Sequence, residues 1–250
     1  MKSFQFYKIE SFPTLKVDTP VKNTIQKSFS GEDEDLVTSI ELKSHLKDTT
    51  IDLIQIVSEV EYQENGYAFS EIGGERQRFT FTSFRHPVDF SAYLDMTRKI
   101  LILPQPQKVC RSVFINLNTV ERVAVLKMEV NFHKVSQICP EYFGAWFRGV
   151  SPRVNAAGLA GNQVQDDNYF KKLLKDGELS NATVPWKYDG AEHRLMISKS
   201  GALILQKEYR DNQTLEIAVV TDAFDNLLSK VWEPKKSRKQ VREIGIPVEP

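Results

Sequence analysis

The sequence lacks several features that define common classes of protein. It has only 2 cysteines among its 250 residues, Cys110 and Cys139, which are too few for a disulfide framework or a structural zinc site. Its longest apolar runs, such as Ile100–Leu103, are far shorter than the roughly 20 residues of a membrane-spanning helix. The N-terminus carries no signal-peptide pattern. We therefore predict a cytoplasmic protein with reduced thiols and no membrane segment.

An excess of charge of one sign is also missing. The 33 Lys and Arg residues balance the 33 Asp and Glu residues, so the formal net charge is zero. Any case for nucleic-acid binding must therefore rest on a local basic surface. With 41% hydrophobic and 26% charged residues, the composition is that of a globular chain and excludes a disordered one.

Strong catalytic motifs are absent as well. The chain has no Gly-x-Ser-x-Gly elbow, Walker loop, His-Glu-x-x-His sequence or kinase signature. The absence of these motifs favours a binding or assembly protein over an enzyme. We expect no catalytic residues, no cofactor and no bound metal.

The hydrophobic patterning indicates strands mixed with a few helices. Alternation predicts strands at 2–9, 51–57, 60–62, 75–85, 100–103, 112–118 and 123–135, and a three-stranded meander at 182–188, 191–198 and 202–209. Helical spacing favours helices at 36–48, 89–99, 166–177 and 214–232, although 215–220 fits a strand equally well. The segments 11–30 and 151–163 are predicted to be connections. Turn signals stand at Glu64-Asn65-Gly66 and Gly73-Gly74.

The order of these elements contains no βαβ alternation, which predicts the α+β class with mainly antiparallel sheets and a few packed helices. We expect an N-terminal α+β subdomain at 1–138, a C-terminal α+β subdomain containing the meander at 139–233, and a basic tail at 234–250. A single continuous domain fits the pattern nearly as well.

The basic tail is the first candidate site. It has five cations with no acid between them: Lys235, Lys236, Arg238, Lys239 and Arg242. Such a run can neutralise phosphates and release counterions. The ordinary alternative is a solvated tail with no specific partner.

The segment 76–86 is the second candidate, because it interleaves cations with aromatic residues. Aromatic faces stack on unpaired bases, while Arg76, Arg78 and Arg85 could hold phosphates. On a strand, however, Phe79 and Phe81 face away from Arg76 and Arg78, which equally fits an amphipathic strand with a buried aromatic face.

A metal-dependent nuclease is a third interpretation. Such sites combine an acid with a Glu-x-Lys sequence, and this chain has Asp33 or Asp35 followed by Glu41 and Lys43. In them the carboxylates hold a divalent ion and the lysine helps to orient the attacking water. That chemistry needs Glu41 and Lys43 on one face of a strand, whereas the surrounding apolar spacing favours a helix.

Two weaker motifs have stronger structural explanations. Glu129 and His133 fall on one face of the predicted strand 123–135, but a metal or proton-transfer site needs more partners. Gly158-Leu159-Ala160-Gly161 has the spacing of a phosphate-cradling loop, but the acids that follow it, Asp166 and Asp167, oppose a phosphate.

Aromatic residues motivate an alternative function as a protein-interaction or scaffold subunit. They are Tyr142, Phe143, Trp146, Phe147, Trp186 and Trp232. Aromatic side chains are enriched in the centres of interfaces and also in protein cores, so the composition alone leaves both options open.

Residues Ile40 to Leu46, followed by the strand pairs to Phe84, resemble the start of the phage-exclusion protein RexA and similar prokaryotic defence proteins. The resemblance implies DNA binding in a phage-defence system, and it assigns no role to any residue. Our leading hypothesis is a non-catalytic nucleic-acid-binding protein that contacts phosphates through the tail cations and Arg76, Arg78 and Arg85. It would act as a homo-oligomer or as a subunit of a larger complex.

Overall fold

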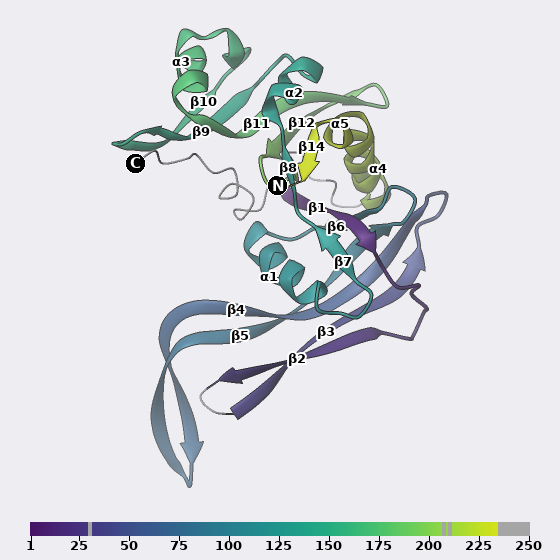
Figure 1. The fold of residues 1–250 in the computed structure, drawn as a ribbon, viewed down its shortest axis with the longest axis vertical. Helices are drawn as coiled ribbons and strands as arrows, with labels where there is room; N and C mark the ends of the chain where they lie inside the picture. Colours follow the sequence, from purple (N-terminus) through teal and green to yellow (C-terminus); the bar gives the residue numbers. More distant parts are fainter. Residues whose placement is uncertain (30–31, 207–208, 210–211, 235–250) are drawn as a thin grey trace, which may run out of the picture. The chain divides into compact units, whose positions relative to one another are not determined.

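The structure of the chain is a computed structural model that describes residues 1–29, 32–206, 209 and 212–234 (Figure 1). It forms two compact units. The first, here called the meander unit, combines Met1–Lys8 with Leu126–Pro250, and the second, here called the hairpin unit, is Ile9–Val125. The observed units divide the chain at residues 8 and 125, whereas the sequence-based division lies at residue 138.

The sheet of the meander unit is antiparallel, with the strand order β10-β9-β11-β12-β13-β1. Its strands are β1 (Lys2–Ser11, of which residues 2–8 belong to this unit), β9 (Gly144–Ser151), β10 (Val154–Ala160), β11 (Glu178–Tyr188), β12 (Ala191–Ser198) and β13 (Ala202–Leu205). The turn between β11 and β12 uses Asp189 and Gly190, both with positive φ, as expected for a tight hairpin. The predicted meander is therefore confirmed.

Helices and short strands complete the meander unit: β8 (Met128–Val130), α2 (Phe132–Ile138), η1 (Val164–Asp166), α3 (Asn168–Asp176), α4 (Gln213–Ala223), η2 (Phe224–Leu228), α5 (Ser229–Val231) and β14 (Trp232–Pro234). Asp167 caps α3 by accepting hydrogen bonds from the backbone N–H groups of Tyr169 and Phe170. The predicted acidic start of this helix and its end at Gly177 are confirmed.

The hairpin unit is built on antiparallel strands in the order β6-β5-β4-β3-β2. These are β2 (Val21–Phe29), β3 (Glu32–His45), β4 (Ile51–Ile72), β5 (Glu75–Asp95) and β6 (Ile100–Leu103), followed by α1 (Gln107–Leu117) and β7 (Ala124–Leu126). Helix α1 is fixed to β4 by a buried polar contact, because Asn116 donates to the Ser58 hydroxyl and to the Glu59 carbonyl.

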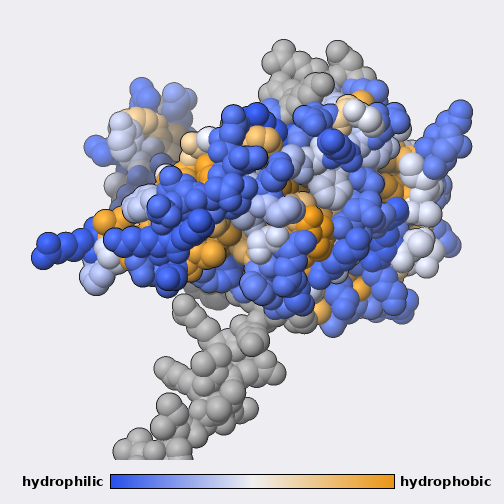
Figure 2. Space-filling model, turned by 90° about the horizontal axis from the view of Figure 1, so that it is seen from above, coloured by the Kyte–Doolittle hydropathy of each residue, from blue (hydrophilic) through white to orange (hydrophobic). Residues whose placement is uncertain are grey.

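The fold is therefore α+β and mainly antiparallel, as predicted. Each unit has its own hydrophobic core. In the meander unit, Phe6 stacks on Phe224 with ring centroids 5.4 Å apart, and Trp232 packs edge-on to both rings. In the part of the chain that the structure describes, no helix is long and apolar enough to cross a membrane. The face in Figure 2 is mostly hydrophilic, with hydrophobic patches interrupted by polar side chains.

Three predicted elements of the hairpin unit are wrong. Residues 36–48 and 89–99 were expected to be helical, but they belong largely to strands β3 and β5. Near Asp95, β5 is buried on both faces between β4 and β6, and this burial removes the alternation that identifies a strand. Residues 112–118, expected as a strand, lie mostly in α1, whose buried Cys110, Val113 and Leu117 follow helical spacing.

Other local predictions also need correction. Glu64-Asn65-Gly66 is not a turn but an irregularity inside β4, where the pairing shifts between Gln63 and Gly66. The expected connections 11–30 and 151–163 contain strands β2 and β10. The alternation at 123–135 ends at α2, so His133 lies on a helix rather than beside Glu129 on a strand.

Candidate nucleic-acid interface

The longest strand pair of the hairpin unit carries the candidate interface. Strands β4 and β5 are 22 and 21 residues long and pair from Ile51 with Asp95 to Ile72 with Glu75. The pairing of β3 with β4 ends at Val57, so among the described strands the far parts of β4 and β5 pair only with each other (Figure 1). Gly73 and Gly74 close it with positive φ, as predicted for this turn. We call residues 66–81 the hairpin tip.

Two arginines of the hairpin tip stack on aromatic rings of the opposite strand. The guanidinium carbon of Arg76 lies 4.1 Å from the ring centroid of Phe69, and that of Arg78 lies 4.2 Å from the ring centroid of Tyr67. The two rings contact each other at 5.6 Å with a nearly perpendicular orientation. We call these four residues the Arg–aromatic face.

The pairing register explains this arrangement. Phe69 lies directly opposite Arg78, and Tyr67 lies opposite Thr80, so each arginine stacks on the ring that is diagonal to it. Each exposed cation–π contact contributes about 0.5–1 kcal/mol. The contacts therefore order the side chains but leave them accessible, since Tyr67 is 57% and Phe69 50% exposed.

The opposite face of the hairpin tip carries Phe79 and Phe81 and no cation, together with the polar residues Ser70, Glu75 and Gln77. Phe79 is 44% exposed, and the ring of Phe81 lies over Gly66, where a Cβ atom would stand 2.5 Å from it. The expectation that Phe79 and Phe81 point away from Arg76 and Arg78 agrees with the register, but these rings form part of an exposed surface rather than a core.

The structure brings together only some of the predicted residues. Arg76 and Arg78 share a face, whereas Arg85 lies seven residues beyond Arg78, about 23 Å along an extended strand. Arg85 is half-buried and stands opposite Glu61. The tail cations Lys235, Lys236, Arg238, Lys239 and Arg242 lie outside the described residues.

Tyr67 and Phe69 are the residues that the sequence analysis missed. The signal was present, because a two-residue turn at Gly73-Gly74 places Phe69 opposite Arg78 when the flanking strands are paired outward from it. Alternation within one strand does not reveal this pairing, which follows only from the register across the turn.

The nuclease residues are arranged along one strand rather than around a centre. Glu41 and Lys43 lie on β3, and the Lys43 ammonium pairs with the Glu41 carboxylate at 2.9 Å. Asp35 lies six residues before Glu41 on the same strand, which corresponds to about 20 Å, too far for a shared ion. Among the described residues, no group of three or more His, Cys, Asp or Glu side chains could hold a metal ion.

Two of the six aromatic residues proposed for a protein interface are buried in the meander unit, and the other four are half-buried. Tyr142 and Phe147 are buried against Phe170. Trp186 donates its indole N–H to Asp222 at 2.9 Å. Trp232 belongs to the aromatic cluster around Phe6. Phe143 and Trp146 are half-buried. The observation that suggested an interface there is therefore explained by packing.

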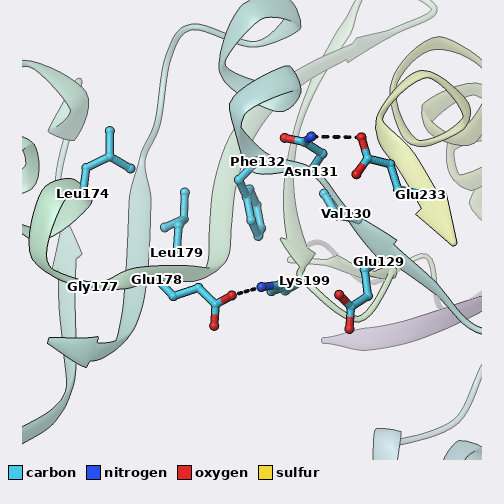
Figure 3. Close-up of a pocket in the computed structure, with 10 residues that line it drawn as sticks. All are labelled: Glu129, Val130, Asn131, Phe132, Leu174, Gly177, Glu178, Leu179, Lys199 and Glu233. Carbon is cyan, nitrogen blue, oxygen red and sulfur yellow. Dashed lines mark hydrogen bonds and ion pairs between the residues drawn. The ribbon is translucent and has the colours of Figure 1, made fainter. Parts of the chain in front are cut away.

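A cavity of about 400 Å³ in the meander unit has an acidic lining (Figure 3). Glu178 pairs with Lys199 on one side, and Asn131 donates to Glu233 at 2.9 Å on another, with Glu129 nearby. Three carboxylates against one ammonium oppose the binding of a phosphate. The Gly158–Gly161 segment also has no phosphate-cradling geometry, because Gly158 to Ala160 are part of β10 and no helix follows directly.

Comparisons with known proteins found no protein-family model that matches the chain and no significant match among curated proteins. The resemblance to the phage-exclusion proteins has no support from these comparisons, so the function has to be argued from the hairpin itself.

Proposed function

We propose that the chain is a non-catalytic nucleic-acid-binding protein and that the Arg–aromatic face contacts unpaired nucleotides. The observation that carries this proposal is the stacking of Arg76 and Arg78 on two exposed rings. Tyr67 and Phe69 offer faces on which bases can stack, and an arginine that lies flat on a ring keeps N–H donors in its plane for phosphate oxygens.

The charge of the hairpin defines what kind of binding to expect. The segment from residue 61 to residue 85 contains four acids and three arginines. They are Glu61, Glu64, Glu71 and Glu75, and Arg76, Arg78 and Arg85. The net charge of this segment is −1, so it provides no long-range attraction to phosphates, and base stacking supplies most of the affinity. Two phosphate contacts on a single strand give a slope of log K against log salt of about −1.4.

The test is a salt series with single-stranded and double-stranded DNA and RNA. We compare the full chain with Arg76→Ala/Arg78→Ala, and with Arg111→Gln/Arg122→Gln as a control that removes two exposed arginines elsewhere. We expect the full chain to bind single strands in preference to double strands. We expect the salt slope to flatten in the Arg76→Ala/Arg78→Ala variant and to stay unchanged in the control. Absence of binding at low salt, or equal effects of both variants, contradicts the proposal.

The tail cations are tested in the same series by replacing all five with Gln. If only this variant loses affinity, the tail rather than the hairpin contacts the phosphates. A role in prokaryotic phage defence is a separate proposal that rests on the sequence resemblance alone.

A second candidate function, docking of a protein partner, is favoured by the exposed aromatic surface on the opposite face of the hairpin tip. Phe79 is exposed on a strand pair with nearly balanced charge, and apolar aromatic surface is typical of protein interfaces. Phe79→Ser separates the two functions, because it removes apolar area on the face opposite Arg76 and Arg78. We expect this variant to bind nucleic acid as the full chain does if the first proposal holds.

A further inference from the structure

Strand β10 forms one edge of the sheet in the meander unit. It pairs with β9 on one side, and no described strand pairs with its other side. Five of its seven residues are exposed, and the other two are half-exposed. Its outer edge therefore offers backbone hydrogen-bonding groups to a further strand.

The hydrogen-bond pattern identifies which residues face outward. The Gly161 N–H donates to the Phe143 carbonyl at 3.1 Å. In an antiparallel pair, alternate residues exchange both hydrogen bonds with the neighbour, so Ala157 and Leu159 bond to β9. Ala156, Gly158 and Ala160 consequently direct their N–H and C=O groups away from the sheet.

This edge lacks the features that usually block strand addition. Residues 154–160 contain no charged residue and no proline, and the pairing irregularity is confined to the start of the strand, between Val154 and Ala156. Trp146 lies over Gly158, where a Cβ atom would be 3.0 Å from the indole, and this packing occupies one face of the sheet but not the edge.

The two ends of β10 carry opposite charge. Arg153 is exposed immediately before the strand. After the strand, a cavity of about 460 Å³ is lined by Leu159 to Val164, Asp166 and Asp167, and both aspartates are exposed. An antiparallel neighbour of the same sequence would bring each arginine to the acidic end of the other copy.

We infer that two copies of this chain pair edge to edge through β10, with Gly158 opposite Gly158 and Arg153 of each copy beside Asp166 of the other. In this register Ala156 lies opposite Ala160, and Arg153 lies opposite Gln163, which lines the cavity. The arrangement is a closed two-fold dimer, because the same patch serves both copies. It does not depend on nucleic-acid binding.

The expected dimer is weak. Three outward-facing residues in each copy form about six backbone hydrogen bonds, and interfaces have about one hydrogen bond per 100–200 Å². The contact therefore falls at or below the lower size limit of specific interfaces, roughly 1,200 Å². The dissociation constant of the dimer should be micromolar or higher. Sedimentation equilibrium over a wide range of protein concentrations is therefore the suitable measurement.

The experiment compares the full chain with Ala160→Pro and Ala160→Ser. Proline removes an outward N–H and is tolerated on an edge strand, whereas serine keeps the N–H and serves as the matched control. We expect the full chain and Ala160→Ser to approach twice the 28.7 kDa chain mass, and Ala160→Pro to remain monomeric. A full chain that stays monomeric at every concentration, or a dimer that Ala160→Pro leaves unchanged, overturns the inference.

A charge exchange tests the register and does not depend on a proline. Arg153→Glu places an acid beside Asp166 and should weaken the dimer at least tenfold, while Arg153→Glu/Asp166→Arg should restore it. Asp167 is left unchanged because it caps α3. If the double variant dissociates as readily as Arg153→Glu, the proposed register is wrong.

Discussion

The guanidinium of Arg78 lies 4.2 Å from the ring centroid of Tyr67, on the neighbouring strand of an exposed hairpin. An arginine in this position is held by the ring while its donors remain available, and the ring keeps one accessible face. The same combination is repeated at Arg76 and Phe69. Together the pairs form a small platform suited to stacking and phosphate contact.

The rings of this platform should contribute more to binding than the guanidinium charges. Tyr67→Ala/Phe69→Ala removes two stacking surfaces, each worth about 1–3 kcal/mol, so affinity for single-stranded oligonucleotides should fall by about fivefold to 100-fold per ring. Tyr67→Phe/Phe69→Tyr keeps both rings and should bind normally. Fluorescence anisotropy measures the difference. Equal affinity of the alanine variant and the full chain would remove the platform from consideration.

The geometry of the guanidinium also matters. Arg78→Lys keeps the charge but loses the flat group that stacks on Tyr67. We expect affinity to fall toward that of Arg78→Ala, with the salt slope retained because a cation is still present. A lysine variant with full affinity would show that charge alone is used.

The contact of Gly66 with Phe81 makes a specific prediction about the stability of the hairpin. A Cβ atom at Gly66 would stand 2.5 Å from Phe81 Cζ, so Gly66→Ala must displace the ring and should destabilise the hairpin by about 1 kcal/mol. In a Phe81→Ala background the obstacle is gone. There the same change should be neutral or stabilising by about 0.4–1 kcal/mol, because alanine restricts the unfolded chain.

Hydrogen exchange of the hairpin amides measures both effects locally. The sign reversal between the two backgrounds is the critical result. If Gly66→Ala has the same effect with and without the Phe81 ring, the ring does not pack on this glycine.

The turn between β5 and β6 depends on an ion pair between a buried carboxylate and a partly exposed arginine. Asp95 is fully buried, accepts hydrogen bonds from the Thr50 hydroxyl and the Arg98 backbone N–H, and pairs with the Arg98 guanidinium at 2.6 Å. Asp95→Ala leaves these donors without the carboxylate and should lower the free energy of unfolding by about 3 kcal/mol. Glu121→Ala, at an exposed carboxylate, should change it by less than about 0.5 kcal/mol. Similar denaturation curves for the two variants would contradict this assignment.

The fold was predictable where the hydrophobic pattern along a strand matches the burial of that strand. The meander alternates because one face of each strand is buried, and its turns carry Asp189-Gly190 and Ser200-Gly201. The prediction failed where burial on both faces removed the alternation, as at Phe90 to Asp95. It also failed at Ile40, which pairs with both β2 and β4 and therefore lies in a strand despite the helical spacing around it.

The candidate interface was only half predictable for a related reason. Arg76 and Arg78 stand out along one strand, but Tyr67 and Phe69 join them only through the register of the hairpin. A pattern within one strand contains no information about its neighbour, whereas the glycine turn does. The distance from these arginines to Arg85 likewise follows from the extended strand and not from the composition of the segment.

Alkaline pH should destabilise the meander unit through Cys139. Burial raises the pKa of this thiol from 9.0 to about 11, and burial together with the nearby Cys139 raises the pKa of Tyr142 from 10.0 to about 12. A raised pKa means that the folded chain holds its proton more tightly than the unfolded chain does. The resulting stabilisation is complete below pH 9.0 and is lost as the pH rises toward about 11.

Urea unfolding across this pH range tests the prediction. Cys139→Ala removes the thiol and should reduce the loss of unfolding free energy between pH 9.0 and about 11, whatever its effect on stability at neutral pH. Tyr142→Phe should reduce the loss at the upper end of the range, while Tyr169→Phe, at an exposed tyrosine, serves as the matched control. Because only a buried thiol couples its proton to folding in this way, an unchanged pH dependence in Cys139→Ala would show that Cys139 is accessible to solvent.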